Sequence, residues 1–394
     1  MKGYSPFKFN LIHPIVIFCL IYQIIGVGCK DDTKSGQEEN YCQIDSTAEI
    51  VVQLENNMKW RHRWAQWKEL DSVSYYIGLN RQSGQLECID IKSRKPYVLV
   101  VYPKEGPLIV SEPHGFYVHN LDSIFIFSQF RLFLMNKEGK IRRYWNINRP
   151  ELGSLTVRGI DFGELNFANT ISNDIPLYYD DDENSLYFGL INIKTDKYDP
   201  AFYKHPICGR FNLNDSTFTS LPIYFPEDYQ KNIYVLDQPN ITFLDDRIIY
   251  NFKIYSKFYI FDKESGKITE YDCPSWFTPN IVAPLIAQPG EDRIQAELTN
   301  LSMNPEFRAV QYDPFRDCYY RFHYGPYPGN PNEGRRGYLY LCIMNSDLQK
   351  ISETRMNLEH SYQGAVITPN GLMVSRWSKE EGLGTYTFFK SECE

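Results

Sequence analysis

A four-strand unit in the first half of the sequence is repeated along the chain. Residues 121–147 read LDSIFIFSQFRLFLMNKEGKIRRYWNI. Ser123–Gln129, Arg131–Met135 and Lys140–Ile147 are runs of β-branched and aromatic residues separated by short breaks, and Gly115–Asn120 supplies a fourth strand before them. One four-stranded sheet cannot bury both faces until neighbours pack on it. Repetition of such a unit therefore predicts an all-β fold of the β-propeller type.

Similar units predict six blades. We expect these blades over residues 73–102, 115–147, 176–223, 241–273, 308–356 and 365–390. The sixth unit lacks an outer strand, and Ala48–Leu54 is a lone strand with no hairpin partner nearby. We expect it to pair with Thr385–Lys390, because that pairing closes the ring and removes an exposed edge. Glu55–Leu70 is interpreted as a loop.

Composition agrees with a packed β-rich domain. The chain has 30 tyrosines and 25 phenylalanines, and aromatic residues favour strands over disorder. Its formal net charge is -8. Because nucleic-acid binding relies on positive charge, the sequence predicts no nucleic-acid partner.

The N-terminal segment has the layout of an export signal. Lys2 and Lys8 precede the apolar core Ile15–Ile25, which is shorter than the roughly 20 apolar residues of a membrane span. A membrane anchor is the weaker alternative. Small residues directly before Cys29 resemble the lipobox of bacterial lipoproteins, which predicts lipidation of Cys29, with plain secretion as the alternative. The sequence is therefore divided into a signal peptide (1–28), a flexible tether (29–47) and a six-bladed β-propeller (48–394).

The layout resembles a known family. Six units with Asx–Gly-type turns, a signal ending in a cysteine and a short tether are similar to the TolB-like six-bladed propeller lipoproteins catalogued as domain-of-unknown-function 4221. Lys30–Asp32 resembles the short charged tag that carries some Gram-negative lipoproteins to the cell surface, and a solvated linker is the alternative interpretation. The resemblance implies a propeller fold in an outer-membrane lipoprotein exposed at the cell surface. It implies no activity, because propellers serve many unrelated functions.

Connection lengths predict which end of the ring binds. If the strands of each blade are named A to D from the centre outward, A–B and C–D connections lie at one end, and B–C and D–A connections lie at the other. The long segments are almost all B–C or D–A connections. Since loops on a rigid scaffold carry binding residues, we expect a ligand at this end, which is called the long-loop face.

Aromatic and basic side chains gather in these long segments. Indole and guanidinium groups suit sugar faces, peptide side chains and carboxylates. The alternative is that the tryptophans cover the ends of blades while the arginines extend into solvent. The predicted binding residues are Trp60, Arg61, His62, Trp64, His114, His205, Arg335, Arg336 and Trp377.

Catalytic and metal-binding motifs are not recognised in the sequence. It contains no G-x-S-x-G, H-E-x-x-H, P-loop or C-x-x-C pattern. We expect no metal and no cofactor, and we interpret the cysteines inside strands as small buried residues rather than disulfides. Two functions stay open. One is a monomeric envelope protein that binds a peptide, glycan or partner protein and meets the membrane only through its lipid. The other is a lyase or hydrolase, which convergence of His62, His114 and His205 would favour.

Overall fold

The computed structural model describes most of the chain between Gln43 and Glu392. The described residues are 43–55, 57–110, 113–128, 131–146, 156–157, 160–161, 166–167, 177–191, 198–236, 238–286, 292–330 and 335–392. They belong to the compact unit Tyr41–Glu394, so the predicted signal peptide and Cys29 lie outside them. Within these ranges no helix has both the length and the apolar character needed to cross a membrane.

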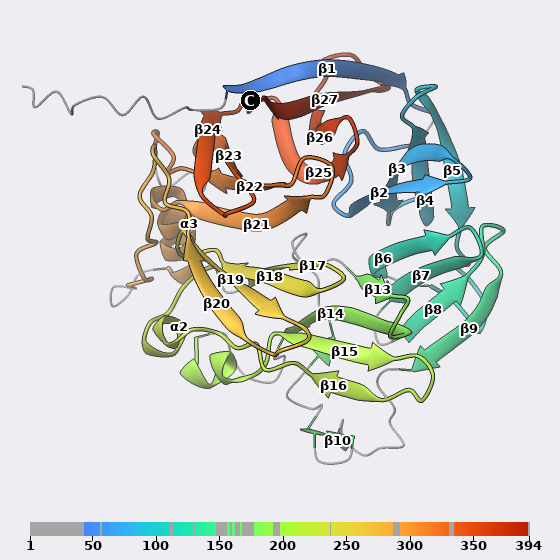
Figure 1. Cartoon of the computed structure of the whole chain (residues 1–394), viewed down its shortest axis with the longest axis horizontal. Coiled ribbons are helices and arrows are strands. Elements are labelled where there is room, and N and C mark those ends of the chain that lie inside the picture. Colours follow the sequence, from blue (N-terminus) through green and yellow to red (C-terminus); the bar gives the residue numbers. More distant parts are fainter. Residues whose placement is uncertain are drawn as a thin grey trace, which may run out of the picture. The chain divides into compact units, whose positions relative to one another are not determined.

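Six antiparallel sheets form the blades of a six-bladed β-propeller, which confirms the predicted fold class (Figure 1). Blade one contains β2 (Ala65–Leu70), β3 (Val73–Asn80), β4 (Gln85–Asp90) and β5 (Lys95–Val101). Blade two contains β6 (Pro113–Asn120), β7 (Ser123–Ser128), β8 (Arg131–Met135) and β9 (Ile141–Asn146). Blade three contains β13 (Tyr178–Asp180), β14 (Ser185–Ile191), β15 (Cys208–Asn212) and β16 (Phe218–Ser220).

The other three blades follow the same order, except that the last one takes its outer strand from the start of the chain. Blade four contains β17 (Pro239–Phe243), β18 (Arg247–Phe252), β19 (Lys257–Asp262) and β20 (Ile268–Asp272). Blade five contains β21 (Glu306–Asp313), β22 (Cys318–Tyr324), β23 (Leu339–Met344) and β24 (Lys350–Arg355). Blade six contains β25 (His360–Thr368), β26 (Gly371–Arg376), β27 (Leu383–Glu392) and β1 (Gln43–Gln53).

The remaining described elements are short and lie in the connections. They are the strands β10 (Thr156–Val157), β11 (Ile160–Asp161) and β12 (Asn166–Phe167), the 3-10 helix η2 (Pro200–Lys204), α2 (Glu227–Lys231) and α3 (Arg293–Met303). β10 pairs with β11, and β12 pairs with β14.

Ring closure by the N-terminal strand is confirmed. β1 lies antiparallel to β27, with Val51 opposite Thr385 (Figure 1). The strand begins at Gln43 rather than at Ala48, and a β-bulge between Ser46 and Ala48 joins the two parts. The first part of the strand therefore occupies the end of the segment that was expected to be a tether.

The inner strand of blade one corrects the sequence interpretation, in which Glu55–Leu70 was a loop. β2 occupies the last six residues of that segment. Its polar residues do not show the apolar pattern of a strand, but near the centre of the ring they have a structural role. The side chain of Gln66 donates to the carbonyl oxygen of Val118 in β6 (3.1 Å) and accepts from the Val118 N–H (2.9 Å). Neighbouring inner strands do not pair with each other through backbone hydrogen bonds. Their buried N–H and C=O groups still need partners, and polar side chains such as Gln66 supply them.

Each pair of neighbouring blades encloses its own hydrophobic cluster. Among the described residues there are six clusters, one at each blade-to-blade interface. The cluster between blades six and one contains Ile50 and Val52 of β1 beside Tyr76 and Ile89. Closure of the ring therefore rests on apolar burial as well as on strand pairing.

The strand bounds confirm the parity of the connections. Turns from the first to the second strand and from the third to the fourth strand are short in every blade where they occur. The long connections all run from a second to a third strand or from an outer strand to the next inner strand, and they span residues 54–64, 102–112, 147–177, 192–207, 221–238, 273–305 and 325–338. The first residues of the inner strands consequently lie beneath the long-loop face.

Candidate ligand-binding site at the channel

A cavity of about 340 Å³ lies among the inner strands. Residues of β2, β6, β17, β21 and β25 line it, together with Phe322 of β22 and Leu177 next to β13, so every blade contributes. The volume is at the small end of the roughly 300–1,000 Å³ that is usual for ligand pockets. Aromatic, amide and guanidinium groups line the cavity together with aliphatic side chains, as in sites where a few polar groups orient a ligand.

Bulges in two inner strands shape this lining. In β21, Arg308 and Ala309 lie between the pairs that Phe307 and Val310 make with β22. In β25, the register shifts between Ser361 and Val366, and Tyr362 lies in this interval. A bulge bends a strand and redirects its side chains. Arg308 and Tyr362 both line the cavity, with the guanidinium carbon of Arg308 4.3 Å from the centre of the Tyr362 ring.

Gly364 makes the bulge of β25 possible. Its φ is +72°, a conformation that costs an L side chain strain energy, and a Cβ there would lie 2.7 Å from the carbonyl oxygen of His62. The inner strand of blade six can therefore approach the segment before β2 only with glycine at this position.

Basic side chains surround one buried carboxylate beside the cavity. Glu306 is 2% exposed, and its carboxylate lies 2.7 Å from Arg308, 2.7 Å from Arg336 and 3.9 Å from Lys253. Burial lowers the pKa of the Arg336 guanidinium, and the charge of Glu306 opposes that shift. Arg336 also donates to the carbonyl oxygen of Leu301 in α3 (2.9 Å). Glu306 thus orients two arginines, one of which lines the cavity.

The segment before β2 supplies a further guanidinium. Arg63 lines the cavity, and its guanidinium carbon lies 5.1 Å from the centre of the Trp64 ring. Trp64 is buried in the cluster between blades one and two and also lines the cavity. The expectation that the tryptophans lie on a loop needs correction, because Trp67 belongs to β2 and Trp64 immediately precedes it. Trp60 and Arg61 do lie in the connection, with Arg61 5.1 Å from the Trp60 ring.

His62, one of the predicted binding residues, is buried and hydrogen-bonded within blade one. It is 2% exposed, and its Nε2 lies 2.7 Å from Glu87 Oε2, while its Nδ1 lies 3.4 Å from the Tyr76 hydroxyl. Burial of Glu87 opposes ionisation, but hydrogen bonds from His62, the Lys59 N–H and neighbouring amides outweigh it and lower the pKa of this carboxyl. His62 is absent from the cavity lining. It fastens the segment before β2 to blade one.

His205 is likewise embedded in apolar surroundings. It is 7% exposed, its ring packs edge-on against Phe202 and Phe225, and its Nδ1 lies 2.8 Å from the carbonyl oxygen of Pro206. Burial lowers the pKa of its imidazole, so the neutral form is favoured. The predicted binding residue His205 is therefore placed among aromatic side chains of the connections 192–207 and 221–238.

The other predicted residues are distributed over the long-loop face. Arg336 pairs with Glu306, which in turn pairs with Arg308 of the cavity lining. Arg335 is exposed, and Trp377 is 48% exposed. The side chain of His114 lies outside the described residues. His62 and His205 make their contacts in different blades, and among the described residues no group of three His, Cys, Asp or Glu side chains could hold a metal ion. The convergence that would favour an enzyme is therefore not observed for these two histidines.

The cavity also contains residues outside the set predicted from the sequence. Arg308, Gln311, Tyr362 and Gln363 all occupy inner strands. Their only sequence signal is a break in the alternation of apolar and polar residues, as in the run FRAVQYD of β21. Such a break does not reveal a bulge, because the extra residue is defined only by its pairing with the neighbouring strand.

Comparisons with known proteins agree with this fold. The chain is similar to a crystal structure of a member of the DUF4221 family from Bacteroides vulgatus, with a TM-score of 0.73, 18% identity, and coverage of 91% of this chain and 100% of that one. It is also similar to a candidate exported protein from Bacteroides fragilis, with a TM-score of 0.52, 8% identity, and coverage of 91% and 98%. No curated protein matches the chain. The family described as "Domain of unknown function (DUF4221)" matches residues 37–355, and this protein belongs to that family.

Proposed function

We propose that this protein is a binding module of the cell envelope that holds a small anionic ligand in the channel, entering from the long-loop face. An acidic sugar or the carboxylate end of a peptide has the required chemistry. The observation that carries the proposal is the presence of Arg63 and Arg308 in the lining of one cavity, beside Trp64 and Tyr362.

The chemistry of these groups supports an anion over a neutral ligand. A guanidinium donates two parallel hydrogen bonds to a carboxylate, and such charge-assisted bonds are about twice as strong as neutral ones. Arg308 is held on the face of Tyr362 and by Glu306, so little side-chain freedom is lost when a ligand binds. Gln66, Gln311 and Gln363 add amide groups that suit hydroxyls. The cavity volume suits one sugar ring or one terminal residue.

A calorimetric screen of the purified full-length protein tests the proposal. The probes are glucuronate, galacturonate and acidic dipeptides, each paired with its neutral counterpart. We expect an acid to bind at least 10-fold more tightly than its neutral counterpart. Arg63→Gln should weaken that binding by about 10- to 100-fold, because a hydrogen bond to a charged group contributes roughly 1.5–3 kcal/mol.

Arg142→Gln is the matched control. Arg142 forms an exposed ion pair of 2.6 Å with Asp122 at the opposite end of blade two. It should leave both affinity and stability unchanged, because exposed ion pairs contribute at most about 1 kcal/mol. Equal affinity for acids and neutral counterparts would contradict the proposal. So would normal binding by the Arg63 variant together with loss of binding in the Arg142 variant.

For localisation, we propose an outer-membrane lipoprotein anchored through Cys29 and exposed at the cell surface. Support comes from the charged start, the short apolar core and the small residues before Cys29. The similarity to a candidate exported protein is compatible with export.

A further inference from the structure

Two buried cysteine thiols meet at the interface of blades four and five. Cys273 directly follows β20, and Cys342 lies in β23. Their sulfur atoms are 3.2 Å apart, and each residue is 1% exposed. Both belong to the hydrophobic cluster between these blades. A disulfide requires the sulfurs to approach by only about 1 Å more.

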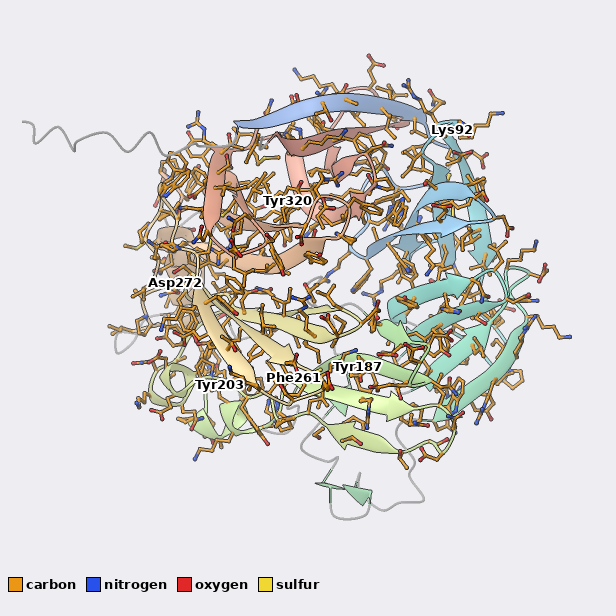
Figure 2. The ribbon with its side chains drawn as sticks, viewed as in Figure 1. Lys92, Tyr187, Tyr203, Phe261, Asp272 and Tyr320 are labelled. Carbon is orange, nitrogen blue, oxygen red and sulfur yellow. The ribbon has the colours of Figure 1, made fainter. Side chains whose placement is uncertain are left out.

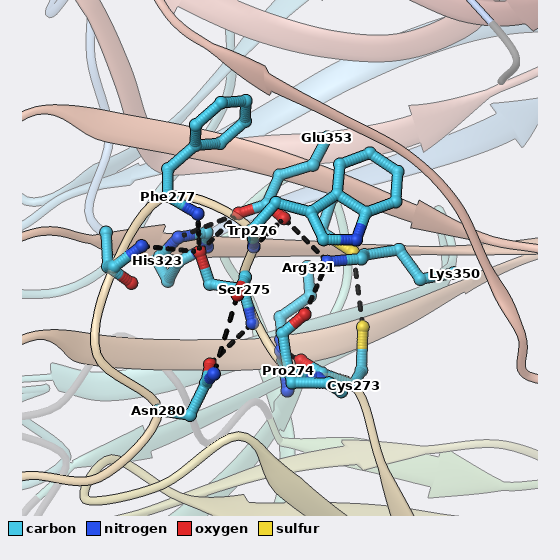
Figure 3. A network of polar contacts seen from close by, with 12 residues as sticks. Cys273, Pro274, Ser275, Trp276, Phe277, Asn280, Arg321, His323, Lys350 and Glu353 are labelled. Carbon is cyan, nitrogen blue, oxygen red and sulfur yellow. Dashed lines mark hydrogen bonds and ion pairs between the residues drawn. The ribbon is translucent and has the colours of Figure 1, made fainter. Parts of the chain in front are cut away.

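The backbone that carries Cys273 is clamped onto blade five (Figure 3). Arg321, which is 1% exposed, donates to the carbonyl oxygens of Ser256 and Cys273. Lys350 donates to the carbonyl oxygen of Pro274 and lies 2.8 Å from Glu353. Because these bonds hold the carbonyl groups of Cys273 and Pro274 on blade five, the Cys273 thiol is held in place against Cys342.

The next residues are clamped as well. Glu353 accepts hydrogen bonds from the Ser275 hydroxyl (2.6 Å) and the Trp276 N–H (2.8 Å), and it pairs with His323 at 3.2 Å (Figure 3). Glu353 and Lys350 both belong to β24, so the start of the 273–305 connection is attached to the outer strand of blade five.

The surroundings give the two thiols different acidities. The hydrogen bond with Cys342 lowers the pKa of Cys273 against the effect of burial, and the charges of Arg321 and Lys350 lower it further. Burial raises the pKa of Cys342. These shifts arise in the closed interface, because Cys342, Arg321 and Lys350 all belong to blade five, and there the thiolate form is favoured at Cys273 over Cys342. By contrast, burial raises the pKa of Cys88 and of Cys208, which belong to other interfaces.

We propose that Cys273 and Cys342 form a disulfide that joins blades four and five in the exported protein. The oxidant is a protein disulfide of the thiol–disulfide exchange class. The thiolate of one of the two cysteines attacks one sulfur of that disulfide, which releases the other sulfur as a thiolate and leaves a mixed disulfide. The thiolate of the second cysteine then attacks the sulfur of the first, which forms the Cys273–Cys342 bond and releases the partner as a thiolate. Two protons and two electrons pass from the pair to the donor, which becomes a dithiol.

The burial of both sulfurs sets the order of events. A donor protein cannot reach sulfurs that are 1% exposed, so exchange takes place before blades four and five have closed on each other. The bond then closes a loop of about 70 residues, which restricts the unfolded chain and so stabilises the folded ring. The inference goes beyond ligand binding, although it rests on the proposed export for its oxidant.

Peptide-resolved thiol labelling tests the pair in the full-length protein. Free thiols in the denatured envelope fraction are alkylated with iodoacetamide, and thiols released by reduction are then alkylated with N-ethylmaleimide. We expect the second label on Cys273 and Cys342 and the first label on Cys88 and Cys208. In Cys273→Ala, Cys342 should carry the first label. Iodoacetamide on both Cys273 and Cys342 of the wild-type protein would overturn the proposal.

Thermal unfolding gives a second readout. Reduction should lower the Tm of the wild-type protein by about 5 °C, whereas the Tm of Cys342→Ala should not depend on the reductant. An unchanged wild-type Tm after reduction of the pair would overturn its role as a staple. If fractionation finds no protein in the envelope, the localisation is wrong, and the pair is tested on purified protein refolded with oxidised glutathione. Failure of the two thiols to pair there would overturn the disulfide itself.

Discussion

At the scale of single residues, buried charges in this propeller are organised by hydrogen bonds from several elements. Glu353 is the best example, because its side chain is fully buried and meets groups from β22, β24 and the connection after β20. Burial alone would raise the pKa of its carboxyl. Hydrogen bonds from His323, Lys350, Ser275 and the Trp276 N–H outweigh burial and lower the pKa to about 2.

This shift predicts how stability depends on pH. The folded-state pKa of Glu353 lies below the unfolded value of 4.5, so its contribution, on the order of 3 kcal/mol, is present above about pH 4.5. It is lost as the pH falls toward 2. Buried His323, whose pKa burial lowers, adds a separate loss below its ordinary value of 6.5. The free energy of unfolding can be measured with urea at pH values between 7 and 2. Below pH 4.5 it should fall less steeply with decreasing pH for Glu353→Gln than for the wild-type protein.

Glu264→Gln serves as the control, because Glu264 is exposed in the turn after β19. Its unfolding should follow the wild-type pH dependence. Identical slopes for Glu353→Gln and the wild-type protein below pH 4.5 would show that the carboxyl does not contribute as argued.

At the scale of elements, β1 closes the ring by two means. It adds an outer strand to blade six through β27, and it buries Ile50 and Val52 in the cluster with blade one. The alternation along the strand is clear, since Val52 is fully buried while Val51 is 44% exposed. The strand therefore removes an open edge and completes an interface at once.

Substitutions at these neighbouring positions separate burial from strand pairing. Val52→Asp places a charge in an apolar cluster and should cost at least about 3 kcal/mol. Val51→Asp keeps the backbone ladder and should change stability by about 0.5 kcal/mol. Thermal and urea unfolding measure both effects, and aggregation is expected for Val52→Asp because β1 can then detach from β27. Equal loss of stability in the two variants would contradict the role given to the buried face.

At the scale of the whole molecule, the fold arranges polar side chains around a hub that is enclosed by six apolar interfaces. Figure 2 shows side chains over the whole ring, with Tyr187 and Phe261 in the region of blades three and four and Tyr320 in blade five. Each interface contains its own cluster, so the ring is stable without a single large core. The cavity at the centre of the ring is thereby available for binding.

The proposed attachment predicts a change in cell fractionation. Cys29→Ser removes the sulfur that would carry the acyl chains, so the protein should move from the membrane fraction to the soluble fraction. Its ligand affinity should not change, because the cavity is built from the propeller. Cys42→Ser is a matched cysteine control that should stay in the membrane fraction. Membrane retention of the Cys29 variant would contradict lipid anchoring, and protease treatment of intact cells tests surface exposure.

Local patterns in the sequence determined the blades and their closure. Alternating residues and Asx–Gly turns specify hairpins within a few residues, as in the Asp262–Gly266 turn between β19 and β20. The missing outer strand of the last unit identified the role of Ala48–Leu54, and connection lengths identified the long-loop face. These features are readable because hairpin pairing is local and strand direction alternates with strand count.

Only the tertiary structure decided which side chains meet at the hub and between blades. His62 is buried against Glu87, the bulges place Arg308 and Tyr362 in the cavity, and Cys273 meets Cys342 across an interface. Each of these outcomes depends on the register of inner strands or on the packing of whole blades, which connect residues far apart in the chain. A sequence pattern specifies which face of a strand is apolar, but the partner on that face is defined only when the blades pack.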